Sequence, residues 1–183
     1  EGVNVLVNHK AKQFVKRDNK NILITEHKGV DVEIEFDTLI VAVGRAANTA
    51  GFGLEELGVR LNPNKTIEVN DYLQTNIPTI LACGDVAGPY QFTHVAAHQA
   101  WFASVNALFG GLKRFKVDYS VIPWATFSEP EVARVGLNEL EAKEQGIAYE
   151  VTKYEMDDLD RAIVDSEDHG FVKVLTVPGK DKI

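Results

Sequence analysis

The residues best suited to chemistry follow a short apolar run at 80–83. That run is typical of a buried strand. Gly84 ends it and lets the backbone approach a bulky group, and Asp85 then places a carboxylate at the carboxyl end of the strand. In open α/β sheets, nucleotides bind at that edge. A long helix is predicted from Thr93, and its amino end suits an anion or an electron-rich carbonyl. A buried strand followed by an ordinary Gly-Asp turn would explain the same residues without a ligand.

The stretch around Asp85 resembles the second flavin-binding stretch of the pyridine nucleotide–disulfide oxidoreductases, which include glutathione reductase, dihydrolipoamide dehydrogenase and mercuric reductase. The I-x-A-x-G-D part of the family pattern is present as Ile80, Ala82, Gly84 and Asp85. The resemblance implies that Asp85 binds the ribityl chain of FAD. It also implies that the backbone N–H groups of Thr93 and His94 face the pyrimidine side of the flavin.

A second match lies at 37–48, where the family has D-x-L-[LIV]-x-A-x-G-R-x-P-N. Ala47 replaces the usual proline, which removes a stiff turn but no reactive group. The resemblance implies that the backbone of Gly44 lies against the dinucleotide, with Arg45 beside it. A plain strand exit followed by a solvated arginine is the alternative.

The third and longest match is 122–136, which is similar to the I-P-x-x-x-F-[ST]-x-P-x-[IV]-A-x-V-G opening of the family's dimerisation domain. The resemblance implies a homodimer in the parent protein. It also implies that the backbone of Ala125 meets the carboxamide of the nicotinamide.

The implied reaction moves hydride from NAD(P)H through FAD to a disulfide, a metal ion or a similar acceptor. The G-x-G-x-x-G fingerprints, the C-x-x-x-x-C pair and the H-x-x-x-x-E pair of the family are absent from these 183 residues. We therefore expect an internal piece of a longer polypeptide, with no catalytic residue of its own and no activity alone. Two alternatives stay open: a non-catalytic dimerisation or interaction module, and a flavoenzyme of the NADH oxidase or ferredoxin reductase type.

The predicted fold is α/β, with mixed α+β character. Pieces of a FAD/NAD(P)-binding β-meander and Rossmann-like domain fill residues 1–117, and part of an α/β dimerisation domain fills 118–183. The apolar and alternating patterns predict strands and helices, and the helix at 93–109 is apolar nearly all round, which predicts burial on most sides. The predicted strands are 3–7, 13–17, 22–25, 30–36, 39–43, 66–69, 80–83, 148–154 and 171–177, and the other predicted helix is 138–145 with Asn138 as its N-cap.

Composition narrows the class of protein further. The net charge of −8 is spread among mixed acidic and basic residues, which argues against a nucleic-acid partner, and no apolar run approaches a membrane span. The single cysteine, Cys83, excludes an internal disulfide framework, and we expect a cytoplasmic setting. His94 and His98 lie one helical turn apart, but no third ligand is evident, so we expect a packed or interface pair and no metal site.

Overall fold

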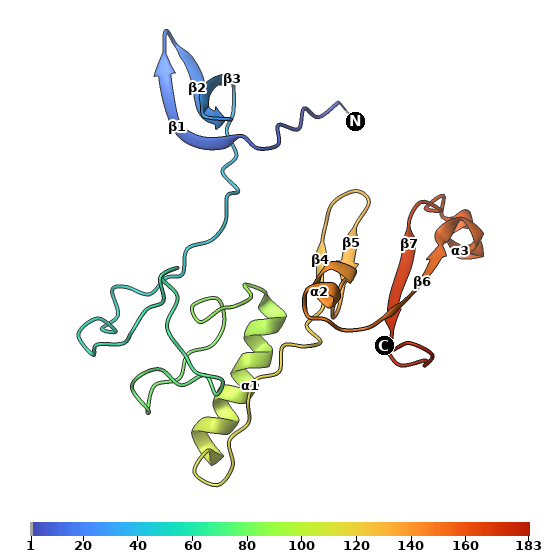
Figure 1. Ribbon diagram of the computed structural model, residues 1–183. Coiled ribbons are helices and arrows are strands. Elements are labelled where there is room, and N and C mark those ends of the chain that lie inside the picture. Colours follow the sequence, from blue (N-terminus) through green and yellow to red (C-terminus); the bar gives the residue numbers. More distant parts are fainter. Residues whose placement is uncertain (1) are drawn as a thin grey trace. The chain divides into compact units, whose positions relative to one another are not determined.

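The computed structural model describes residues 2–183, which form an α/β chain of mixed strands and helices (Figure 1). The chain divides into two compact units, of which the first ends at Ala46 and the second is Ala47–Ile183. Each unit has its own hydrogen-bonded sheet structure, so each is described separately below.

The first unit is an antiparallel sheet of three strands in the order β1-β2-β3. These strands are β1 Lys10–Arg17, β2 Lys20–His27 and β3 Val30–Phe36. Ion pairs cross one face of the sheet, for example between Lys12 and Asp31 at 2.6 Å. Because these pairs are exposed, we expect them to contribute little to the free energy of folding. The three antiparallel strands confirm the predicted meander at 13–36.

Two strands predicted for the first unit are wrong, because residues 3–7 and 39–43 adopt no strand conformation. A strand needs a hydrogen-bonding neighbour along its length, and none of the described strands pairs with either segment. The apolar side chains of Ile40 and Val43 are 86% exposed. Their apolar character predicts burial, but the described residues do not cover them.

The second unit begins with an irregular stretch built over a small apolar core of Val59, Ile67, Ala82 and Ala87. The strands predicted at 66–69 and 80–83 are reduced to single antiparallel bridges, one of them between Gln74 and Leu81. Side-chain amides hold the loops instead: Asn76 accepts a hydrogen bond from the backbone of Arg60 and donates one to that of Gly58. Asn side chains commonly replace backbone partners in this way.

Helix α1, Thr93–Phe109, has the bounds predicted from the sequence. The prediction that it is buried on most sides is wrong, because only Val95 and Gln99 are fully buried among its residues. These two lie one turn apart and so share one face. Trp101 and Leu108, on other faces, are 56% and 75% exposed. The described residues therefore cover one stripe of this helix.

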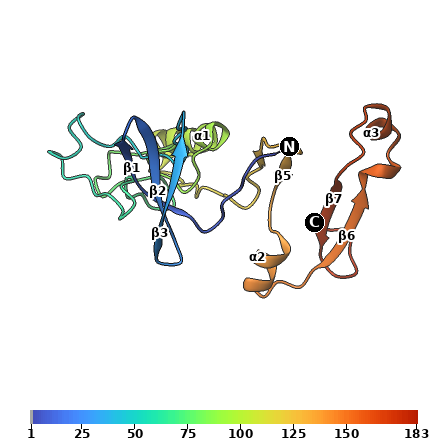
Figure 2. The same cartoon turned by 90° about the horizontal axis from the view of Figure 1, so that it is seen from above.

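The remainder of the second unit contains short elements. They are β4 Trp124–Thr126, β5 Val132–Arg134, α2 Glu139–Glu144, β6 Glu150–Glu155, the 3₁₀ turn η1 Met156–Asp158, α3 Asp160–Val164 and β7 Phe171–Thr176. β4 pairs with β5, and β6 pairs with β7, each in antiparallel fashion. Figure 2 shows α3 beyond the end of the β6–β7 hairpin. The acidic stretch at 155–161 is partly helical.

The predicted helix at 138–145 is confirmed as α2 with Asn138 at its N-cap. The Asn138 side chain accepts from the backbone N–H of Glu141, and the Glu141 carboxylate accepts from the backbone N–H of Asn138. The domain boundary at 117/118 stays a prediction. No helix among residues 2–183 has the length and hydrophobicity needed to cross a membrane.

The capping box gives a direct test of this local structure. Replacing Asn138 by Ala removes the acceptor for the Glu141 N–H, so we expect the free energy of unfolding to fall by about 1 kcal/mol. Urea denaturation followed by circular dichroism measures it. Asn138→Asp keeps an acceptor at the same place and serves as the control. Equal losses for the two variants would contradict the assigned cap.

Candidate functional site

The backbone at Gly84–Gly88 forms a tight turn around Asp85. The carbonyl oxygen of Gly84 accepts hydrogen bonds from the N–H groups of Ala87 at 2.9 Å and Gly88 at 3.2 Å. Gly84 has φ +83°, and a Cβ placed on it would lie 3.3 Å from the Cβ of Ala96 in α1. Both its conformation and its closeness to the helix therefore favour glycine. Asp85 is half-buried in this turn.

The turn is attached to α1 by the side chain of Gln99, which is 0% exposed. Its Oε1 accepts from the N–H of Gly84 at 2.5 Å, and its Nε2 donates to the carbonyl of Gly88 at 2.6 Å. Nε2 also donates to the hydroxyl of Tyr119 at 2.8 Å. One buried amide thus joins both ends of the turn to the helix and to the segment that follows it.

The amino end of α1 lies directly after this region. Phe92 is its N-cap, and no side chain in the described part of the chain caps it. The first helical hydrogen bond runs from Ala96 N–H to Phe92 O at 3.0 Å. The N–H groups of Thr93 and His94 precede that bond and have no partner within the helix. Both residues are exposed, so the helix end can offer N–H donors and a positive dipole to a ligand.

The two helix histidines hold the segment after α1. Nε2 of His94 donates to the carbonyl of Pro123 at 2.7 Å, and Nε2 of His98 donates to that of Asp118 at 2.8 Å. Among residues 2–183, no three His, Cys, Asp or Glu side chains gather closely enough to hold a metal ion. The histidines therefore act here as hydrogen-bond donors to two carbonyl groups.

Ala125 lies in β4, where it pairs with Ala133 of β5 and is half-buried. Its neighbour Trp124 packs against Phe92, with ring centroids 6.1 Å apart, and carries the guanidinium of Arg134 4.6 Å from its ring centroid. These contacts tie the β4–β5 hairpin to the amino end of α1.

An ion pair joins strand β5 of this hairpin to α2. Arg134 binds both carboxylate oxygens of Glu141, at 2.7 and 2.8 Å. The hydrogen bond from Arg134, with that from the Asn138 N–H, holds the pKa of Glu141 below its ordinary value. Glu141 thus joins α2 to the strand that pairs with Ala125.

The predicted site residues divide between the two units. Gly84, Asp85, Thr93, His94 and Ala125 belong to the second unit and are connected through the contacts above. Gly44, with φ +130°, and Arg45 belong to the first unit, and both are exposed. Sequence reasoning missed Gln99. The available signal was an uncharged polar residue within a nearly continuous apolar helix.

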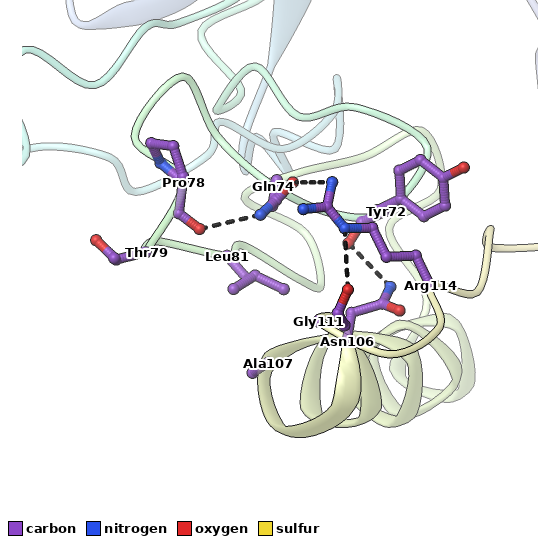
Figure 3. A pocket seen from close by; sticks show the side chains of 10 residues that line it. Tyr72, Gln74, Pro78, Thr79, Leu81, Asn106, Ala107, Gly111 and Arg114 are labelled. Carbon is purple, nitrogen blue, oxygen red and sulfur yellow. Dashed lines mark hydrogen bonds between the residues drawn. The ribbon is translucent and has the colours of Figure 1, made fainter.

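A cavity of about 340 Å³ lies elsewhere in the second unit, at the carboxyl end of α1. Figure 3 shows Arg114 reaching from the segment after α1 to Gln74, a contact of 3.3 Å. Asn106 and Ala107 line this cavity. Since a helix rises 1.5 Å per residue, the cavity lies about 20 Å along α1 from Thr93. It is therefore separate from the candidate site.

The sequence matches two family profiles. The profile described as pyridine nucleotide-disulphide oxidoreductase matches residues 1–100, and the profile for the dimerisation domain of pyridine nucleotide-disulphide oxidoreductases matches 122–183. Two curated relatives align with the whole chain. Dihydrolipoyl dehydrogenase of Staphylococcus aureus is 36% identical over 183 residues, and mercuric reductase of Streptomyces lividans is 34% identical over 186. The chain spans 38% of the length of each.

Solved structures resemble the fold. LpdA from Mycobacterium tuberculosis superimposes with a TM-score of 0.82 and 26% identity, over 97% of this chain and 38% of its own. RclA from Escherichia coli, an HOCl-induced flavoprotein disulfide reductase, superimposes with a TM-score of 0.78 and 26% identity, over 96% of this chain and 39% of its own.

Gly84→Ala tests whether the turn needs glycine. An alanine there would adopt a left-handed conformation, at a cost of about 1–2 kcal/mol, and would also press on Ala96. Gly58→Ala is the matched control, because Gly58 has φ +70° but no described atom within 4 Å of its added Cβ. Urea denaturation should show a larger loss for Gly84→Ala. A loss no greater than that of Gly58→Ala would contradict the close packing.

Proposed function

Because this chain belongs to the pyridine nucleotide-disulphide oxidoreductase family, we propose that it forms part of a flavoenzyme that moves hydride from NAD(P)H through FAD to a disulfide, a metal ion or a similar acceptor. Proteins of this family use FAD and NAD(P)H. The chain covers 38% of such relatives and contains one cysteine, so the complete polypeptide is needed for activity. We expect that polypeptide to work in the cytoplasm.

The single observation that supports a flavin site most strongly is the close placement of the Asp85 turn against α1. The backbone of Gly84 packs so closely on α1 that an added Cβ would lie 3.3 Å from the Cβ of Ala96. The Gln99 side chain holds the turn from the helix side. The nearby helix end is uncapped by any side chain in the described residues and carries no acidic residue in its first turn. An electron-rich carbonyl would therefore meet N–H donors without repulsion from a carboxylate in the first turn of the helix. These features fit FAD.

We assign different tasks to the residues of this site. The Asp85 carboxylate would accept hydrogen bonds from ribityl hydroxyl groups. The N–H groups of Thr93 and His94 would donate to the pyrimidine edge of the flavin and stabilise negative charge there. FAD supplies the chemistry when bound, by accepting hydride and passing electrons to the acceptor. The chain itself binds and orients the group.

Ala125 of the second unit would contact the nicotinamide nucleotide through its backbone. Ala125 lies in a hairpin that His94 and Trp124 fix to the amino end of α1, which favours a carboxamide contact beside the flavin. Gly44 has an open backbone without a side chain, suited to close approach by a dinucleotide, and Arg45 can contribute a positive charge.

The direct test of this function uses the full-length protein. We expect it to be isolated with a yellow flavin whose absorbance bleaches when NADH or NADPH is added anaerobically. A full-length protein that binds no flavin and consumes no NAD(P)H would overturn the proposal and would favour a non-catalytic interaction module.

We also propose that the segment from Ile122 contributes to a homodimer. The match to the dimerisation domain supports this, as do exposed apolar side chains on β6 and β7, including Tyr154, Phe171 and Val172. Analytical ultracentrifugation of the full-length protein should give the mass of a dimer. Phe171→Glu should shift the population to monomer, and Phe52→Glu, at a similarly exposed phenylalanine in the first half of the chain, should not. An unchanged dimer after Phe171→Glu would contradict this surface.

Asp85→Ala in the full-length protein tests the flavin contact. Losing a charge-assisted hydrogen bond costs roughly 1.5–3 kcal/mol, so FAD should bind about ten- to a hundredfold more weakly. Fluorescence titration of the apoprotein with FAD measures it, and the thermal midpoint reports the fold. Asp71→Ala is the control, because that carboxylate is exposed and forms a surface ion pair with Lys116 at 2.8 Å. Unchanged FAD affinity with a lowered midpoint would assign Asp85 to the turn alone.

A further inference from the structure

We propose that Gln99 is a positioning residue, whose buried amide sets the Gly84–Gly88 turn and thereby places Asp85 against the amino end of α1. The inference rests on the proposed FAD site. It goes further by assigning the accuracy of that site to a side chain that would not itself contact the cofactor.

Besides its internal hydrogen bonds to the carbonyl of Gly84, the turn is held by Ile67, whose N–H donates to the carbonyl of Val86 at 2.7 Å, and by Gln99. It belongs to no strand, and its bounding glycines have φ of +83° and +69°. Gly84 and Gly88 are both buried, so the N–H of one and the carbonyl of the other need protein partners. Gln99 supplies both partners, at 2.5 and 2.6 Å. Its amide thus closes the turn from inside and fixes it to the helix.

The amide can bind in one orientation only. An N–H faces its oxygen and a carbonyl faces its nitrogen, so a flipped amide would place donor against donor and acceptor against acceptor. A leucine has neither group. A carboxylate could accept from Gly84 but would repel the carbonyl of Gly88. A protonated carboxyl, in contrast, can both accept from Gly84 and donate to Gly88.

Gln99 also connects the turn to the nicotinamide side of the proposed site. Its second donor reaches the hydroxyl of Tyr119, four residues before Pro123. Tyr119 packs edge-on against Tyr90, at 5.9 Å between ring centroids, in the loop that leaves the turn. Burial raises the pKa of the Tyr119 phenol, which therefore stays neutral at ordinary working pH. The Tyr119 hydroxyl therefore remains available to the Gln99 amide at neutral pH.

The first experiment compares Gln99→Leu with Asn106→Leu in the full-length flavoprotein. Asn106 is the matched control, because it lies two turns further along α1 and also holds backbone groups, those of Tyr72 and Phe115. Both variants should lower the thermal midpoint. Gln99→Leu should weaken FAD binding about ten- to a hundredfold and alter the flavin spectrum, whereas Asn106→Leu should change affinity by less than about twofold.

Equal effects of the two variants on FAD would overturn the inference and leave Gln99 a general structural residue. A wild-type protein without flavin would instead overturn the proposed function. The two failures are therefore distinguishable within one set of titrations.

The second experiment uses Gln99→Glu, which has nearly the shape of the native side chain. At this buried position the pKa of the new carboxyl is raised, and only its protonated form can reproduce both contacts of the amide. FAD affinity relative to wild type should therefore be reduced at high pH and recover as pH falls through that pKa. The quantity measured is the FAD affinity of Gln99→Glu divided by that of wild type. If this ratio stays constant with pH, or decreases as the pH is lowered, the inference is overturned, even if Gln99→Leu fails to fold.

Discussion

The hydrogen bonds between the Gln99 amide and the backbone of Gly84 and Gly88 are the constraint on which the candidate site depends. The turn lies outside any sheet ladder, and its left-handed glycines would allow many conformations in a free chain. Buried backbone groups must be paired, and here the partners are the side chain of Gln99 in α1 and the N–H of Ile67, which donates to the carbonyl of Val86 at 2.7 Å. The helix therefore takes part in positioning the backbone on both sides of Asp85.

The same helix orients the β4–β5 hairpin by a different set of contacts. His94 donates to the carbonyl of Pro123, Phe92 packs on Trp124, and Trp124 carries the guanidinium of Arg134. His94 and Phe92 lie at the amino end of α1, and Trp124, which contacts Phe92, passes the connection on to Arg134. The Gly84–Gly88 turn and the β4–β5 hairpin are therefore both attached to α1.

Local signals in the sequence were sufficient for helices α1 and α2 but for only some of the strands. The bounds of α1 and the Asn138 capping box follow from neighbouring residues, and both predictions are confirmed. Strands depend on pairing partners. The run at 39–43 has none among the described strands, and the run at 80–83 makes only a single bridge, between Gln74 and Leu81, although the composition of both runs is right. Glycine and aspartate at 84 and 85 were identified by type and spacing. Gln99 was missed because its role comes from contacts 15 and 11 residues away, which no local pattern encodes.

Gln99 and Asn106 together explain how α1 can organise a largely irregular unit. They are seven residues apart, and two helical turns bring them to nearly the same face. Gln99 binds the backbone of the 84–88 turn, and Asn106 binds the backbone of Tyr72 and Phe115. Apolar packing is non-directional and would tolerate sliding of a loop along the helix. Paired amides with fixed donors and acceptors do not, so two polar residues in an apolar helix give the loops a defined register, which a binding site needs more than it needs additional stability.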